Sequence, residues 1–149
     1  MSSRVRLVDQ GSPRLADAGL GAELTPPPGE RWHPYVIPTS LTVNGGSQGT
    51  TSPSVQVGSF DFICTDINFY SATQAFTVLI QDQGTSHAFM PSEVHYFTLI
   101  RADREPWRLR VPYRFQGNGA IYLSATNLAS SGSDTLYVTL IGYRVLPPP

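Results

Sequence analysis

The sequence contains no lysine and few charged residues of either sign, because Asp, Glu and Arg make up only 14% of its 149 residues. A typical soluble domain carries about 25% charged residues, so this surface has few solvated side chains and more area able to pack against another protein. The formal net charge of −1 argues against nucleic acid as the main partner, because phosphate-binding domains usually carry a basic excess. This charge also gives no reason to expect a membrane surface as the partner.

All ten basic residues are Arg, and this bias has two compatible interpretations. Codon usage in a GC-rich genome would produce it without any consequence for function. Alternatively, the bias favours protein interfaces, because the planar guanidinium group pairs bidentately with carboxylates and is weakly hydrated.

Cysteine and long apolar runs are also scarce. Cys64 is the only cysteine, which excludes an intrachain disulfide, and its apolar neighbours predict a buried hydrophobe rather than a reactive thiol. No apolar run reaches the roughly 18 residues that a membrane-spanning helix needs. Residues 1–31 lack the apolar core of a signal peptide, so export by that route is not expected.

Motifs for catalysis or metal binding are missing as well. His87 and His95 lie on adjacent short predicted strands and could approach across a hairpin, but with His33 they complete no metal-binding motif. There is no nucleophile motif and no phosphate-binding glycine loop, and Gly117-Asn118-Gly119 is typical of a hairpin turn. Four acidic residues are conceivable as a glycosidase pair but are more typical of turns: Asp61, Asp66, Asp82 and Glu93. We therefore expect a non-enzymatic protein with no cofactor, no metal and no small-molecule substrate.

The chain divides into three regions. Residues 1–34 are polar and rich in Pro, Gly and Arg, and we expect an extended N-terminal arm without a core of its own. Residues 35–146 show successive strand patterns, and residues 147–149 form a Pro tail that cannot extend a sheet. Short strands separated by turn signals predict an all-β domain, either a β-sandwich or a jelly-roll barrel.

Apolar alternation places the expected strands at 36–43, 60–70, 76–81, 88–90, 94–100, 120–127 and 135–145. Pro38 favours an edge position for the first of them. The 60–70 strand shows a slip in phase that predicts a β-bulge. On its two faces we expect Phe60, Phe62 and Cys64 against Ile63, Ile67 and Phe69. Residues 101–110 are expected to be a polar connection.

The arm is the main clue to function. Ordering it costs about 1–2 kcal/mol per residue in backbone entropy, which only burial against an already folded surface can offset. The arm residues expected at a protein interface are Val5, Leu7, Val8, Leu15, Leu20, Leu24 and Trp32. Alternation of Val5 and Leu7 with Arg4 and Arg6 favours a strand added to the open sheet edge of a neighbouring chain. The alternative is a polar tail without strong contacts.

A second candidate interface is a patch of basic and aromatic residues: Arg101, Arg104, Trp107, Arg108 and Arg110. In the interface interpretation, Trp107 is the apolar anchor and the arginines bind carboxylates. In the simpler alternative, the segment is a solvated loop with local ion pairs to Asp103 and Glu105. Nucleic-acid binding is less favoured, because these acidic residues are interleaved. Trp107 and Tyr113 also allow a carbohydrate-binding hypothesis, in which sugars stack on exposed rings.

Two segments resemble a known family: FTVLIQDQGTSHAFMPSEVHYFTLI, followed by VPYRFQGNGAIYLSATNLASSGSDTLYVTLIGYRV. They combine an Asp-containing turn, a Met-Pro…Val-His strand, an Ala-Thr-Asn-Leu stretch with a Ser/Gly turn, and a final Leu-Ile-Gly-Tyr. This order is similar to that of β-sandwich virion proteins of tailed bacteriophages, the auxiliary capsid or decoration proteins.

The resemblance implies a decoration (cement) protein on the capsid exterior, assembled in the host cytoplasm. It implies a homotrimer that clasps neighbouring major capsid protein subunits with its N-terminal arms, and no nucleic-acid or membrane partner. Bridging several subunits would stabilise the shell through multivalent contact without chemistry. The alternatives are a carbohydrate-binding module or a tail or connector accessory protein.

Overall fold

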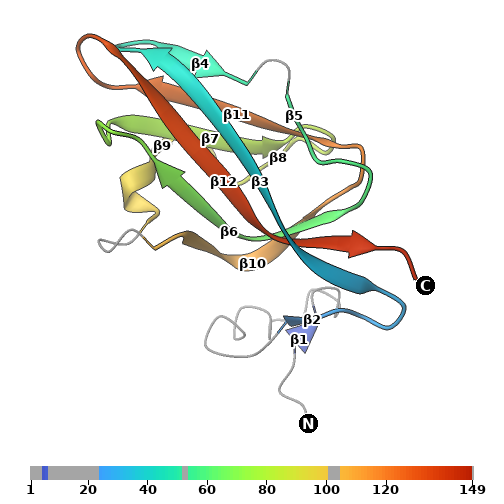
Figure 1. Cartoon of the computed structure of the whole chain (residues 1–149). Helices are drawn as coiled ribbons and strands as arrows, with labels where there is room; N and C mark the ends of the chain where they lie inside the picture. The colour runs from blue at the N-terminus through green and yellow to red at the C-terminus, as the bar shows by residue number, and fades with distance from the viewer. Residues whose placement is uncertain (1–4, 7–23, 52–53, 101–104, 149) are drawn as a thin grey trace.

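The computed structural model describes residues 5–6, 24–51, 54–100 and 105–148. Across this described part, β-strands dominate, the only helical element is the 3-10 turn Tyr96–Thr98, and there is no α-helix. Two antiparallel sheets pack face to face (Figure 1). The predicted all-β sandwich is therefore confirmed.

The four-stranded sheet has the strand order β10-β6-β12-β3. Its strands are β3 (Arg31–Asn44), β6 (Phe62–Tyr70), β10 (Trp107–Phe115) and β12 (Ser133–Leu146). The longest pairing joins β12 to β3 over the full length of both strands, from Arg31 opposite Leu146 to Asn44 opposite Ser133. This ladder forms one side of the molecule in Figure 1.

The six-stranded sheet has the central order β4-β11-β7-β8, with β5 also pairing with β11 and β9 with β7. Its strands are β4 (Gln48–Thr50), β5 (Val55–Gln56), β7 (Phe76–Asp82), β8 (His87–Ala88), β9 (Val94–His95) and β11 (Ala120–Asn127). A separate parallel pair joins β1 (Val5–Arg6) to β2 (Leu24–Thr25).

Alternation builds most of the core between the two sheets. In β7, and over most of β11 and β12, every second side chain is buried, whereas Ser124 and Val145 depart from this pattern. The buried apolar residues that the alternation places in the core are Phe76, Val78, Ile80, Ile121, Leu123, Ala125, Leu136, Val138 and Leu140. The same alternation leaves one face of each sheet available to solvent or to a partner.

The predicted bulge in β6 is confirmed. Asp66 pairs with Ile141 and Cys64 pairs with Gly142, so Thr65 between them has no partner in β12. The prediction of which residues share a face of β6 was wrong in part. The extra residue brings Phe62, Cys64, Ile67 and Phe69 into one core cluster, while Ile63 is buried outside it.

Pro38 sits on an edge strand as predicted, because β3 has a single neighbour in its sheet. Pro34 lies on the same strand four positions earlier. Proline has no N–H to offer, so the free edge of β3 is a poor template for further strand pairing.

Three local predictions were wrong. The expected 94–100 strand ends at His95, where the ring Nδ1 accepts a hydrogen bond from the Phe97 amide at 3.2 Å and caps the 3-10 turn. The expected polar connection over 101–110 already contains the start of β10 at Trp107. The Gly117-Asn118-Gly119 turn is no hairpin, because it joins β10 and β11, which belong to different sheets.

Candidate interaction surface

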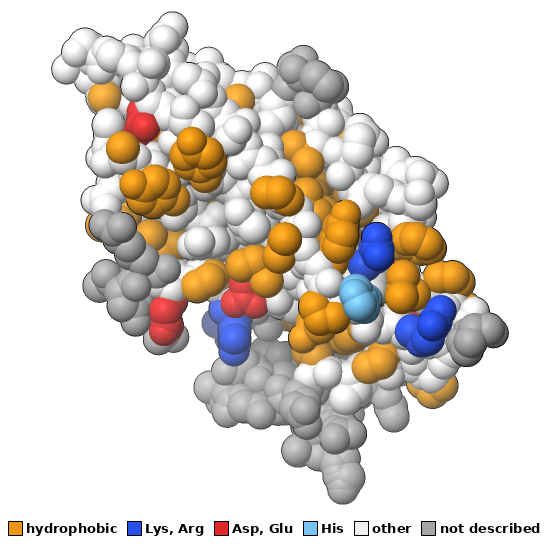
Figure 2. All heavy atoms as spheres, in the orientation of Figure 1, with side chains coloured by type: hydrophobic (Ala, Val, Ile, Leu, Met, Phe, Trp, Pro, Cys, Tyr) orange, Lys and Arg blue, Asp and Glu red, His pale blue; other side chains and the backbone are white. Residues whose placement is uncertain are grey.

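The outer face of the four-stranded sheet carries a broad area without charge. We call it the uncharged face, and its residues are Val36, Pro38, Ser40, Thr42, Asn68, Tyr70, Thr135, Tyr137, Thr139 and Ile141. They lie in cross-strand rows of β3, β12 and β6, since Tyr137 pairs with both Ser40 and Tyr70. Figure 2 shows this side of the molecule, where few charged side chains lie over the middle of β12 and β3.

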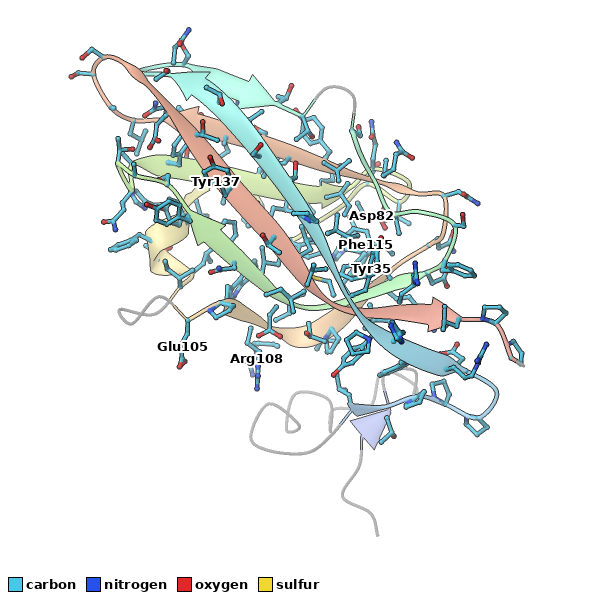
Figure 3. All side chains as sticks on the ribbon, in the orientation of Figure 1. Tyr35, Asp82, Glu105, Arg108, Phe115 and Tyr137 are labelled. Carbon is cyan, nitrogen blue, oxygen red and sulfur yellow. The ribbon has the colours of Figure 1, made fainter. Side chains whose placement is uncertain are left out.

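Two tyrosines dominate the uncharged face. Tyr70 is 50% exposed and Tyr137 is 51% exposed, and their ring centroids lie 6.3 Å apart. Val36, on the same face, is 50% exposed. Tyr137 projects from the middle of β12 in Figure 3. Tyrosines presented in this way are typical of protein interfaces, because they offer large contact area with few rotatable bonds.

The uncharged face is bordered by one ion pair. Arg108 Nε lies 3.5 Å from Asp66 Oδ2, and the Arg108 side chain is 70% exposed. With strands about 4.8 Å apart and rows about 6.8 Å apart, three strands and four rows cover roughly 400 Å². A standard interface buries about 800 Å² on each partner, so this face would supply about half of one.

The predicted basic patch is only partly visible in the structure, because Arg101 and Arg104 lie outside the described residues. Trp107 is half-buried and packs against the core, whereas Arg108 and Arg110 are exposed on β10. Pairing of β10 with β6 stops after Arg108 and resumes at Tyr113. Val111 projects from this unpaired stretch and is 53% exposed, although the sequence pattern gave no sign of it.

Only some of the residues predicted for the arm interface lie within the described residues. Leu7, Val8, Leu15 and Leu20 lie outside the described residues. Val5 pairs with Leu24 of the same chain in the small parallel sheet. Trp32 belongs to β3, where its ring lies 5.5 Å from that of Tyr143 and its Nε1 donates to Glu30.

A three-residue ionic network ties the start of β3 to β10. Arg114 donates from Nη1 to Glu30 Oε2 at 2.9 Å and from Nε to Asp61 Oδ2 at 2.9 Å. Burial alone would lower the pKa of Arg114, but the two carboxylates outweigh it and raise the pKa. Glu30 is thus attached to the domain, and residues 31–34 belong to β3, although the prediction assigned residues 1–34 to the arm.

On the opposite side of the sandwich, Glu93 holds a segment onto the outer face of the six-stranded sheet. Its carboxylate accepts hydrogen bonds from Gln48, Thr77, Ser124 and Thr126, at distances of 2.5–2.7 Å. Burial alone would raise the pKa of Glu93, but these neutral donors together lower it to about 2. The carboxylate therefore anchors the chain just before β9.

Tyr113 is part of an aromatic cluster at one end of the sandwich. Its ring stacks on His87 at 4.6 Å with an interplanar angle of 6°, and Phe89 and Phe115 approach it edge-on. Its hydroxyl donates to the buried Asp82 at 2.7 Å. His87 thus covers a ring face on which a sugar would stack, and no observation favours the carbohydrate-binding hypothesis.

The cysteine and the histidines that the sequence analysis considered do not lie together in the described structure. Burial raises the pKa of the Cys64 thiol to about 12. His87 pairs with Asp82 and His95 with Thr77, five positions apart on β7, so they do not meet across a hairpin. Within the described ranges, no three His, Cys, Asp or Glu residues are grouped as metal ligands would be. No helix in the same ranges is long and apolar enough to cross a membrane.

No family model and no curated protein matches this chain. Among solved structures, the acidic stable capsid of Helicobacter pylori bacteriophage KHP30 contains a chain with 12% identity and a TM-score of 0.44, over 78% of this chain and 96% of that one. The capsid asymmetric unit of cyanophage Pam1 contains one with 16% identity and a TM-score of 0.40, over 84% and 94%. Salmonella Typhimurium PliG, a periplasmic inhibitor of g-type lysozyme, matches with 10% identity and a TM-score of 0.36, over 71% and 90%. At these scores, the likenesses assign neither a family nor a function to this chain.

Proposed function

We propose that this chain is a structural protein of a virus particle, which decorates the capsid exterior and bridges neighbouring capsid subunits. The observation that carries the proposal is the uncharged face, with Tyr70 and Tyr137 half-exposed at its centre. Low overall charge and the resemblance of residues 76–145 to phage virion proteins support it. The function requires no catalysis, no cofactor and no nucleic-acid partner.

The size of the uncharged face bears on how such a protein would bind. At roughly 400 Å² it is smaller than one side of a standard interface. A second contact would be needed for stable attachment, and the N-terminal arm is the candidate. Three copies arranged as a homotrimer would multiply both contacts, which raises the overall affinity without any new interaction.

The decisive experiment is to purify particles made from the genome that encodes this chain and to measure its copy number by quantitative mass spectrometry. We expect a fixed stoichiometry relative to the major capsid protein. Absence from purified particles would contradict the proposal. Attachment at the tail or connector, seen by electron microscopy, would favour the accessory-protein alternative over capsid decoration.

The arm is tested separately. A chain that lacks residues 1–23 retains Glu30 and its bonds to Arg114, so we expect it to fold. Its binding to particles stripped of this protein should weaken at least tenfold relative to the full chain. Undiminished binding would remove the arm from the mechanism and leave the uncharged face as the whole docking surface.

A further inference from the structure

Within the described part of the chain, Arg144, near the end of β12, has a buried Nε–H donor without a hydrogen-bond partner. The guanidinium carbon of Arg144 lies 4.8 Å from the ring centroid of Tyr35 and 5.4 Å from that of Phe60. Its Nε is buried, and no described residue accepts a hydrogen bond from this side chain. By contrast, Arg31, Arg108 and Arg114 each donate to an oxygen atom of the chain.

The unpaired Nε–H of Arg144 is unusual, because buried N–H donors in folded proteins are nearly always satisfied. The flanking rings provide cation–π attraction but accept no conventional hydrogen bond. Tyr35 is 36% exposed, so the site lies near the surface of the molecule. Figure 3 shows Tyr35 close to the crossing of β3 and β12.

None of the ion pairs among the described residues includes Arg144. His33 lies directly opposite Arg144 in the β3–β12 ladder, so both side chains lie on the same face of the sheet. Glu30 and Asp61 lie on the segments next to β3 and β6, and both bind Arg114. No described carboxylate therefore neutralises Arg144, and the site is suited to an anion from another molecule.

We propose that Arg144, framed by Tyr35 and Phe60 and opposite His33, binds an acidic side chain of a neighbouring protein subunit. The two rings restrict the guanidinium plane, which favours bidentate pairing with a planar carboxylate. This inference rests on the proposed function, since assembly supplies the neighbouring subunit. The acidic residue would accept hydrogen bonds from the Arg144 guanidinium group, which no described residue accepts, so assembly would stabilise this end of the sandwich.

The site can be tested by NMR, through the side-chain Nε–Hε signal of Arg144 in the full-length ¹⁵N-labelled chain. The probe is the blocked tripeptide acetyl-Gly-Asp-Gly-amide, and the control is the same peptide with Asn in place of Asp. We expect the Arg144 signal to move with the Asp peptide at least threefold further than the Arg108 signal. The Asn peptide should leave the Arg144 signal unmoved.

Two variants test whether the Asp peptide binds at Arg144. In Arg144→Gln, the Asp peptide should no longer perturb the backbone amides of His33 and Tyr35, whereas Arg108→Gln should respond as the natural chain does. An equal response of the natural chain to both peptides would overturn the inference without use of any variant. A larger response to inorganic phosphate than to the Asp peptide would overturn the carboxylate assignment.

The inference and the proposed function fail separately. A chain that is present in particles but gives no Asp-specific shift would retain its structural function and lose the carboxylate site. A chain that shows the shift but is absent from particles would keep the site and lose the proposed function, and its acidic partner would belong to another assembly.

Discussion

Gly142 of β12 packs against the backbone of Ile63 in β6, so closely that a Cβ atom at position 142 would lie 1.8 Å from the Ile63 carbonyl oxygen. The approach occurs where the bulge shifts the register between Ile141 and Gly142. Only glycine allows the two backbones to lie this close, so the bulge and the glycine depend on each other.

Gly142→Ala should therefore destabilise the fold. The clash involves backbone atoms in the centre of a sheet, which cannot move as a flexible side chain would. We expect the free energy of unfolding to fall by about 3 kcal/mol or more. Urea denaturation followed by tryptophan fluorescence measures this change. Gly84→Ala is the matched control, because its Cβ would lie 3.5 Å from Asp82 Oδ1, an ordinary contact, and stability should hardly change.

Glu93 should make stability depend on pH in acid. Its pKa in the folded chain is about 2, below the ordinary 4.5, so the unfolded chain binds the proton more readily. The stabilising contribution of Glu93 is complete above pH 4.5 and is lost as the pH falls towards 2. We expect Glu93→Gln to unfold more easily at pH 7 by about 1–2 kcal/mol, and the difference from the natural chain to shrink below pH 4.5.

The origin of the low Glu93 pKa can be checked with Thr126→Val, which removes one of the four donors while keeping a β-branched side chain. The pKa of Glu93, followed by ¹³C NMR of its carboxyl group, should rise above 2 in this variant. An unchanged pKa would show that the Thr126 hydroxyl does not contribute to it.

Tyr137→Asp should separate folding from assembly. Because Tyr137 is 51% exposed, the substitution should change the free energy of unfolding by less than about 1 kcal/mol. A charge buried in a docked interface is costly, so binding to particles should weaken at least tenfold, measured by co-sedimentation. Leu128→Asp is the control, since Leu128 is 53% exposed but lies off the uncharged face. Equal binding by both variants would exclude the uncharged face as the docking surface.

Cys64 should be inert in the folded chain. A pKa of about 12 leaves almost no thiolate at pH 8, and the side chain is fully buried. We expect Cys64 of the folded chain to react with a disulfide reagent about a hundredfold more slowly than Cys64 of the urea-unfolded chain. Rapid labelling of the folded chain would show that β6 opens locally, since it lies between β10 and β12.

Local patterns predicted some features that the structure bears out. The edge position of Pro38 follows from its missing N–H, and the bulge in β6 follows from the phase slip in the apolar pattern of residues 60–70. The burial of Cys64 follows from its apolar neighbours. Each of these rests on chemistry within a few residues.

Other features depend on contacts between residues that are distant in the sequence, and local patterns could not predict these contacts. Glu93 receives donors from β4, β7 and β11, and Arg114 binds Glu30 and Asp61. The 3-10 turn after His95 was missed because residues 94–100 are rich in the β-branched and aromatic types that favour strands, whereas the ring nitrogen of His95 caps a turn instead.

By itself, the sequence determined the all-β class, the single buried cysteine and the low surface charge, because hydrophobic alternation and composition act at short range. Only the tertiary structure decided which faces are left open. The pairing of β3, β12 and β6 collects Val36, Tyr70 and Tyr137 into one surface. The same ladder sets Arg144 opposite His33, with no acceptor for its Nε–H among the described residues. The reason is that sheet register brings together residues from opposite ends of the chain, which neither propensity nor spacing encodes.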